Sequence, residues 1–307
     1  MKKKKSLLSR IAEQHRLYIM MLPMLVAVTL FSYVPLSGWV MAFTDYQIGG
    51  SLFGGEFIGL QQFKFFFTQA TDSLYVLRNT LVINLCSLAV NLVSACAFAI
   101  LLNEVRTSWA RRVVQSFSFF PFFVSWVIAY SIFNSFLSMQ TGVVNVLLKD
   151  LGLIEEGINF LADPDYSWGL MIFVNFWKNI GYNSVIFLSA ISGIDQEQYE
   201  AASIDGATHV QKIRHITLPA LAPTLAILLI MNSGWIFSSN FEEFNLFYNS
   251  VNWEKMEVLD VYVYRYGLKL QDYSYATAVG IIKTVASLIM LFLVNMVSKR
   301  ANGRSLV

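Results

Sequence analysis

The sequence predicts an all-α membrane protein with six transmembrane helices. Of its 307 residues, 56% are hydrophobic and only 14% are charged, which lies well outside the usage of soluble proteins. The apolar residues also form six continuous runs, each long enough to cross a hydrocarbon core, which takes about 20 helical residues. These runs lack the ten-residue alternation of membrane β-barrel strands. The expected spans are residues 17–41, 74–102, 113–137, 168–191, 218–240 and 275–297.

The basic residues indicate which ends of these spans face the cytoplasm, because Lys and Arg are retained on that side. Most of the 22 Lys and Arg lie in four segments, whereas most of the 20 acidic residues lie in the other loops. The basic segments are the N-terminal tail, residues 103–112, residues 199–219 and the C-terminal tail. Both termini are therefore expected to be cytoplasmic. The first run is too long for a secretory signal peptide and lacks a small-residue cleavage site, so it is expected to remain as a span.

The expected organisation is one transmembrane domain with short flanking segments. Residues 1–16 form a basic cytoplasmic or interfacial segment near anionic lipid, residues 17–298 the membrane domain with a cytoplasmic loop at 195–219, and residues 299–307 a cytoplasmic tail. Cys86 and Cys96 lie about 15 Å apart on one expected helix and cannot pair. Neither a metal-ligand cluster nor a phosphate-binding glycine loop occurs. We expect this chain to bind no metal, no cofactor and no nucleic acid.

Most of the cytoplasmic loop is expected to form two short helices. Asp195 with Gln198 and Thr208 with Gln211 both have the spacing of a capping box, which marks a helix start. Gly206 separates the two, and a residue without Cβ lets the chain turn sharply there. The predicted product is a helix-turn-helix, here called the knob (residues 195–217).

The end of the loop is expected to fix the knob rigidly to the fifth span. Thr217 can cap that span by accepting a hydrogen bond from a free backbone N–H. Pro219 would then lie in the first turn, where its missing N–H does no harm.

Seven positions of the loop form a recognisable motif. Glu200-Ala201-Ala202, Gly206 and Ile216-x-Leu218-Pro219 stand at the spacing EAA-x3-G-x9-I-x-L-P. This pattern resembles the EAA loop of ABC-importer permeases. An isolated loop acid or turn glycine would be ordinary, but the complete motif lies between the correct two spans. The resemblance implies the type I ABC importer permease fold.

Less specific stretches resemble carbohydrate-importer permeases of the oligosaccharide and polysaccharide type. They are Phe120-Pro121, Ser125-Trp126, Trp177-Lys178 with Gly181, and VYVYRYGL followed by YSYATAVG. One departure is Glu242-Glu243, where that subfamily is expected to have a single Asp.

The resemblance implies a mechanism and a set of partners. The knob would dock on an ATPase subunit and transmit its closure to the helices. The implied coupling residues are Glu200, Ala201, Ala202, Asp205, Gly206, Ile216, Leu218 and Pro219. Six spans enclose only half a pathway, so a second permease, forming a heterodimer, is expected. Two ABC ATPase subunits that hold ATP and magnesium, an extracytoplasmic solute-binding protein meeting the acidic outer loops, and lipid of the plasma (inner) membrane complete the set.

Polar stripes on two spans suggest a path for the cargo. Asn84, Ser87, Asn91 and Ser94 recur at helical spacing, as do Asn175, Asn179 and Asn183. Such stripes can line a water-filled path or only hydrogen-bond neighbouring helices, and both interpretations stay open. Uncharged amides beside aromatic rings suit a neutral oligosaccharide. The candidate path residues are Asn84, Asn91, Trp126, Tyr130, Asn175, Trp177, Lys178, Asn179, Asn183 and Trp235.

Lys178 stands near the middle of the fourth span, where an ammonium is costly unless it is paired or hydrated. It can have a function in the cargo path, or it can fix the bundle by bonding helix carbonyls.

Other classes of function fit the sequence less well. Every His lies in a cytoplasmic segment and the acid pairs Glu155-Glu156 and Glu242-Glu243 lie in or beside outer loops, which disfavours a membrane enzyme. The remaining alternatives are a secondary transporter or channel for a small polar solute, and an ABC importer of a non-sugar solute.

Overall fold

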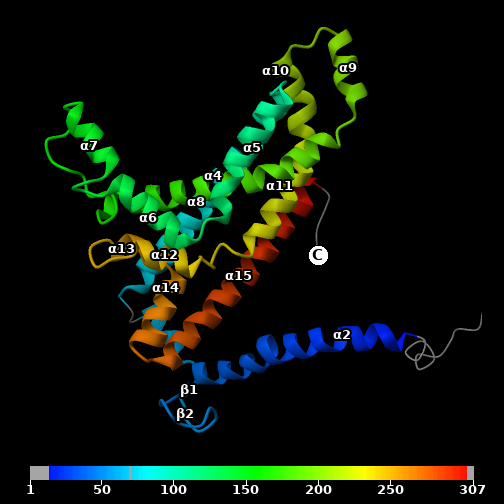
Figure 1. Cartoon of the computed structure of the whole chain (residues 1–307). Coiled ribbons are helices and arrows are strands. Elements are labelled where there is room, and N and C mark those ends of the chain that lie inside the picture. Colours follow the sequence, from blue (N-terminus) through cyan, green and yellow to red (C-terminus); the bar gives the residue numbers. More distant parts are fainter. Residues whose placement is uncertain (1–13, 69–70, 303–307) are drawn as a thin grey trace, which may run out of the picture. The chain divides into compact units, whose positions relative to one another are not determined.

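The computed structural model describes residues 14–68 and 71–302, and this part of the chain is almost entirely helical (Figure 1). Most of the expected segment 1–16 and residues 303–307 of the expected tail lie outside it. Two short strands, β1 (Thr44–Asp45) and β2 (Glu56–Phe57), pair antiparallel. The helices are α2 (His15–Val28), η1 (Thr29–Tyr33), η2 (Val34–Phe43), α3 (Gln61–Thr68), α4 (Ser73–Glu104), α5 (Ser108–Phe123), α6 (Trp126–Leu137), α7 (Val143–Asp150), α8 (Pro164–Ser192), α9 (Gln196–Ile204), α10 (His209–Lys212), η3 (Ile213–Thr217), α11 (Leu218–Ser233), α12 (Phe241–Phe247), α13 (Trp253–Met256), α14 (Leu259–Tyr264), η4 (Arg265–Lys269) and α15 (Tyr273–Asn302).

The chain divides into two compact units. The first contains the residues as far as Thr68 together with Tyr266–Ile281, and the second contains residues 71–265 and those from Ile282 onward. Within the first unit, the Ser274 hydroxyl donates to the Thr44 carbonyl at 2.8 Å and accepts from the Tyr46 N–H at 3.0 Å. These bonds fix the start of α15 to the strand β1. All candidate site residues lie in the second unit.

Four described helical stretches are long and apolar enough to cross a membrane, or five if one bent pair counts as a span. The four are His15–Phe43, Ser73–Glu104, His209–Ser233 and Tyr273–Arg300. Each overlaps one of the expected spans. The helix α8, which covers the expected fourth span, has 29 residues but is not among these candidates.

The expected third span is not one straight helix. Its two halves, α5 and α6, meet at a bend of 107°. Val124 and Ser125 have extended backbone there, and the Ser125 hydroxyl caps α6 by accepting from the Ile128 N–H. Pro121 in the last turn of α5 also cannot donate to the preceding turn. A continuous apolar run in the sequence therefore corresponds to two helices with a break between them.

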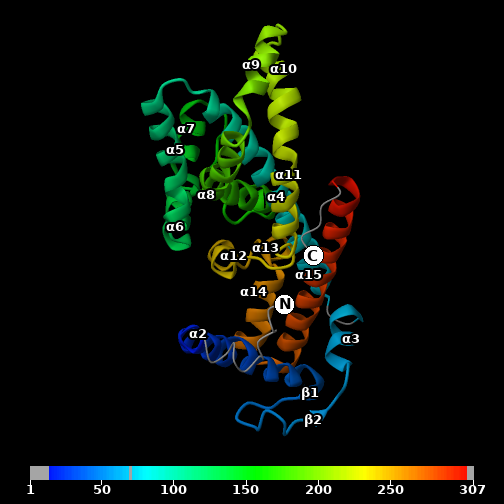
Figure 2. The ribbon, with the colours of Figure 1, turned by 90° about the vertical axis from the view of Figure 1, so that its right-hand side faces the viewer.

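The helix α8 is the centre of the second unit. It begins at Pro164 because the Asp163 side chain caps it, accepting from the Asp165 N–H at 2.9 Å. It packs along α4 and against α5 (Figure 2). Gly181 makes the second contact close, since a Cβ there would collide with the Ser118 carbonyl oxygen. Two buried apolar clusters lie at opposite ends of this packing, one around Phe133 and Val174, the other around Leu92 and Phe187.

The fifth span differs from expectation at both ends. It ends at Ser233 rather than near residue 240, and Asn240 instead caps α12 by accepting from the Glu243 N–H. At its start the helix is continuous from α10 through the π-helical η3 into α11. Thr217 lies inside this stretch with helical backbone and makes no cap hydrogen bond, so its expected capping role is wrong.

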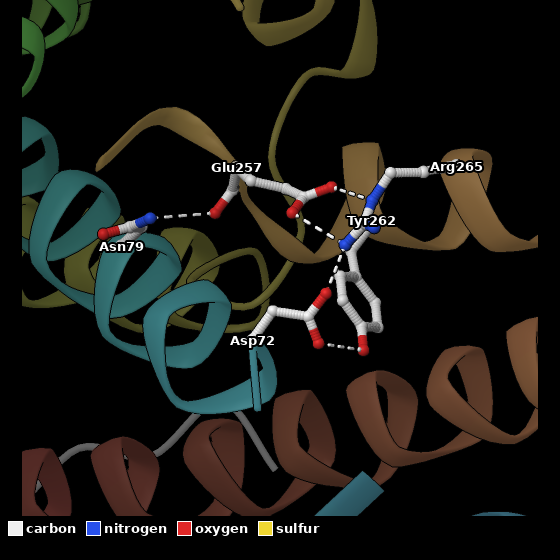
Figure 3. Close-up of polar contacts among 5 residues, drawn as sticks. All are labelled: Asp72, Asn79, Glu257, Tyr262 and Arg265. Carbon is white, nitrogen blue, oxygen red and sulfur yellow. Dashed lines mark hydrogen bonds and ion pairs between the residues drawn. The ribbon is translucent and has the colours of Figure 1, made fainter. Parts of the chain in front are cut away.

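A partly buried ionic cluster joins the start of α4 to the segment around α14 (Figure 3). The Arg265 guanidinium donates to both carboxylate oxygens of Glu257, at 2.6 and 3.0 Å, and to Asp72. Tyr262 donates to Asp72 at 3.0 Å, and the Asn79 amide donates to the Glu257 carbonyl at 3.0 Å. Burial lowers the pKa of Arg265, but the hydrogen bonds to Glu257 and Asp72 outweigh it and the net direction is upward. The guanidinium therefore stays charged.

Candidate functional site

The knob is a rigid hairpin of two short helices built from local signals. Thr208 and Gln211 form the expected capping box, in which each side chain bonds the backbone of the other. The Asp195 carboxylate caps α9, but it accepts from the Glu197 N–H at 3.0 Å and no reciprocal bond from Gln198 is formed. Gly206 makes the turn between the helices with φ +76°, which L residues rarely adopt.

Two hydrogen bonds hold the parts of the knob together. The buried Thr217 hydroxyl bonds the Tyr199 hydroxyl at 2.9 Å, which links α9 to the base of α11. Lys212 donates to the Ser203 hydroxyl, which joins the two helices of the hairpin. The segment η3 continues directly into α11, so the knob is joined to that helix without a break. In Figure 1 the hairpin of α9 and α10 projects beyond the end of α11.

The structure brings four of the eight predicted coupling residues together at the surface of the knob. Ala202, Asp205, Gly206 and Ile216 line one depression of about 330 Å³ between the two helices. Glu200, Ala201, Leu218 and Pro219 are exposed. Two large apolar side chains of the knob are also exposed to solvent, Ile204 to 87% and Val210 to 72%. Single exposed apolar residues are ordinary, so the docking role of these two side chains depends on the motif around them and stays a proposal.

A second candidate site is a cavity of about 280 Å³ between α4, α8, α11 and α12. Six of the predicted path residues line it: Asn84, Asn91, Asn175, Asn179, Asn183 and Trp235. The two predicted stripes therefore face one space. Among the described residues that line this cavity, Glu243 is the one charged side chain, and none is Lys or Arg.

Glu243 is buried, only 2% exposed, although the acid pair containing it was expected in or beside an outer loop. Its carboxyl group accepts from the Asn175 amide at 3.3 Å. Asn175 in turn accepts from the amides of Asn91 at 2.7 Å and Asn179 at 3.2 Å. The polar stripes thus line a cavity and also bond neighbouring helices, and their role as a cargo path stays a prediction.

The remaining predicted path residues lie outside the cavity lining. Trp126 is buried in the apolar core, Tyr130 packs edge-to-face on Phe247 at 5.0 Å, and Trp177 packs similarly on Phe133 at 5.4 Å. These contacts are typical of core packing. Sequence reasoning left out Asn232, Ser239, Asn240 and Glu243 as path residues, all of which line the cavity. Asn232 had a usable signal, because it is an amide in an apolar run.

Lys178 also lies outside the cavity lining and caps the end of α5. It is 7% exposed, and its ammonium donates to the carbonyls of Pro121 and Phe122, each at 3.2 Å, and of Val124. The last carbonyls of a helix have no partner within the helix. The ammonium also lies 4.8 Å from the centre of the Trp126 ring. This geometry favours the bundle-fixing role, because Lys178 holds the bend between α5 and α6.

We therefore expect Lys178→Met to destabilise the protein by about 1–3 kcal/mol, the cost of leaving buried carbonyls without a donor. Thermal denaturation of the purified complex measures this, with Lys149→Met, an exposed lysine on α7, as the matched control. Unchanged thermal stability combined with altered transport would instead place Lys178 in the path.

Comparison with known proteins identifies relatives along almost the whole chain. Residues 91–303 match the family model described as binding-protein-dependent transport system inner membrane component. The chain is 39% identical over 298 residues to the polygalacturonan/rhamnogalacturonan transport system permease protein YteP of Bacillus subtilis (strain 168), covering 97% of this chain and 92% of that protein. It is 38% identical over 290 residues to protein LplB of the same organism, with coverage of 94% and 90%.

Two solved structures are similar in fold and sequence. One is the crystal structure of a bacterial ABC transporter involved in the import of the acidic polysaccharide alginate, with a TM-score of 0.89, 34% identity and coverage of 97% of this chain and 100% of that one. The other is a bacterial alginate ABC transporter in complex with an alginate pentasaccharide-bound periplasmic protein, with a TM-score of 0.90, 34% identity and coverage of 98% and 100%. Polygalacturonan and alginate are acidic polysaccharides, so these relatives do not support a neutral cargo. That expectation stays a prediction.

Proposed function

This chain belongs to the family of binding-protein-dependent transport system inner membrane components, and we propose that it carries acidic oligosaccharides through one half of a two-permease pathway. It is the inner-membrane, multi-pass permease of an ABC carbohydrate importer and has no catalytic role of its own. That membership sets aside the alternatives of a secondary transporter and a channel, and the relatives that transport carbohydrates argue against a non-sugar cargo. The identity of 39% over 97% of the chain to a polygalacturonan/rhamnogalacturonan permease carries the proposal about cargo.

Six spans are proposed for the membrane domain. The four long apolar helices supply four, the bent pair α5 and α6 supplies the fifth, and α8 supplies the sixth. The charged residue on α8 is compatible with a membrane span, because Lys178 is buried and donates to backbone carbonyls. A second permease is proposed to complete the path beside the cavity that α8 lines.

The knob is proposed to dock on one of two ABC ATPase subunits, which bind ATP and magnesium. Ile204 and Val210 supply apolar contact area, and the caps at Asp195 and Thr208 keep the hairpin rigid. The Tyr199–Thr217 bond and the continuous helix then carry the motion to α11 and the cavity. An extracytoplasmic solute-binding protein would deliver the sugar, as the periplasmic protein does in the related alginate complex.

A neutral oligosaccharide is the second candidate cargo. The observation in its favour is the amide lining, which includes no basic side chain among the described residues. An anion path would be expected to offer Lys or Arg. The acidic cargo remains the better supported proposal, because two independent relatives handle acidic polysaccharides and the second permease can supply the cations.

We expect oligogalacturonides to stimulate ATP hydrolysis several-fold in the complete transporter reconstituted with its binding protein. Neutral maltooligosaccharides and arabinooligosaccharides of equal length are the controls, and uptake of labelled sugar into vesicles confirms transport. Stimulation of ATP hydrolysis by neutral glycans alone would refute the acidic cargo and support the neutral oligosaccharide. Stimulation by amino acids or peptides, with no response to any glycan, would refute a carbohydrate cargo altogether.

A further inference from the structure

A further cavity of the second unit begins where the loop motif ends. It has a volume of about 340 Å³ and lies between α4, α11 and the C-terminal part of α15. Six of its lining residues come from α11, namely Leu218, Leu221, Ala222, Leu225, Ala226 and Leu229. No charged residue is among the described residues that line it. Leu218 is 45% exposed and Val297 on α15 is 62% exposed, so this cavity is a surface groove, here called the α11 groove.

The α11 groove has about the length of one acyl chain in a bilayer. Its lining on α11 runs from Leu218 to Leu229, which spans about 16 Å at 1.5 Å per residue. One leaflet contributes half of a hydrocarbon core that is about 30 Å thick. Beyond Leu229 the two helices come into contact, since a Cβ on Gly234 would lie 3.2 Å from Leu291 Cδ1. The groove is therefore an apolar slot of one leaflet's depth, and its mouth is at the knob end of α11.

Two arginines stand at this mouth. Arg214 lies about one helical turn before Leu218, and Arg300 follows Val297 by three residues, so each shares the face of its helix that lines the groove. Arg300 leans back over the groove, because helical side chains tilt toward the N-terminus of their helix. Both side chains are exposed, and neither has an ion-pair partner among the described residues. This end is expected to face the cytoplasm, where anionic lipid attracts basic side chains.

An apolar slot with two unpaired cations at its mouth matches a lipid of net negative charge. We propose that the α11 groove holds an anionic phospholipid of the cytoplasmic leaflet, with one acyl chain between α11 and α15 and its phosphate bound by Arg214 and Arg300. Guanidinium groups bind phosphate oxygens bidentately. A zwitterionic lipid presents an ammonium beside its phosphate and repels the two arginines, and inorganic phosphate leaves the slot without an occupant. The site goes beyond the importer function proposed above, because it depends on neither the cargo nor the docking of the knob.

The headgroup half of the proposal is tested by lipid competition. The complete transporter is purified in detergent and given equimolar phosphatidylglycerol and phosphatidylcholine with identical acyl chains, and native mass spectrometry counts the lipids that each complex retains. Wild type should prefer phosphatidylglycerol, and Arg214→Gln with Arg300→Gln should reduce this preference about fivefold for each arginine removed. The matched control is Arg106→Gln with Arg112→Gln, which removes two exposed cations between or near the ends of α4 and α5. It should keep the preference of wild type.

The acyl half is tested by filling the α11 groove. Ala222→Trp places an indole in the slot and should remove one retained phosphatidylglycerol per complex. Ala220→Trp is the matched control, because Ala220 is exposed on the same helix but lies outside the lining, and it should retain that lipid. Ala226→Phe fills the slot one turn further along and decides the question if the Ala222→Trp complex does not assemble.

Three results would overturn the lipid site. An equal loss of preference in both double-arginine variants would show that only general surface charge attracts the lipid. Displacement of phosphatidylglycerol by inorganic phosphate, whatever the length of its acyl chains, would show a phosphate site without an acyl slot. Loss of the second permease from the groove-filling variants, with an unchanged lipid count, would show that the groove is a contact between permeases. Each of these results leaves the proposed importer function intact.

Discussion

Arg265→Met should destabilise the protein by about 3–5 kcal/mol, the cost of leaving buried carboxylates without their counter-charge. Glu257 is 1% exposed and pairs with Arg265 at 2.6 Å. Asp72 pairs with the same guanidinium and is also largely buried. One arginine therefore neutralises two acids that stand at the start of α4 and just before α14. Its loss should separate these elements at the end of α4 where Asn79 is also bonded (Figure 3).

Thermal denaturation of the detergent-purified complex measures this effect, and a fall of several degrees in Tm is expected. Arg106→Met, which removes an exposed arginine between α4 and α5, is the matched control and should change Tm little. The triple variant Arg265→Met, Glu257→Gln, Asp72→Asn should recover part of the loss, because no charge is then left unpaired. A Tm for Arg265→Met equal to that of the control would contradict a structural role for the cluster.

The sequence predicted well those features that depend on neighbouring residues. The Thr208–Gln211 capping box, the glycine turn and the extents of α4 and α15 follow from signals within a few residues. The amide stripes also converge as their helical spacing implied, because α4 and α8 pack along each other. The residues that determine the capping box, the turn and the helix extents lie close together in the sequence. The amide stripes follow from the helical period, which the packing of α4 and α8 must respect.

The remaining features depend on contacts that no local pattern records. The apolar run through residues 113–137 hides a bend, since the donors for the last carbonyls of α5 come from Lys178, more than 50 residues away. Thr217 has the composition of a cap, yet its hydroxyl is used by Tyr199 within a continuous helix. Glu243 was placed in or beside a solvated loop on account of its charge, whereas Asn175 accommodates it beside the cavity.

Gly206→Val should abolish substrate-stimulated ATP hydrolysis and uptake while the chain still inserts into the membrane. The structure separates two causes of such an effect. An added Cβ would meet no atom within 4 Å, so the Cβ itself makes no steric collision. The backbone is at φ +76°, and a β-branched residue is strongly disfavoured there. Holding a non-glycine residue in this region costs about 1–3 kcal/mol, which displaces the hairpin from its docking conformation.

Each 1.4 kcal/mol corresponds to a factor of ten in an equilibrium, so this strain depletes the docked geometry about 5- to 150-fold. Gly206→Asn is the matched control, because it adds a similar bulk but tolerates the left-handed conformation. We expect Asn to keep most of the coupled activity and Val to lose it, with both chains recovered equally in membranes and in complex with the second permease. Co-purification of the ATPase subunits should fall only with Val. Equal loss in both variants would mean that bulk at the docking surface, rather than the turn, is what the ATPase detects, and full activity in the Val variant would remove Gly206 from the coupling path.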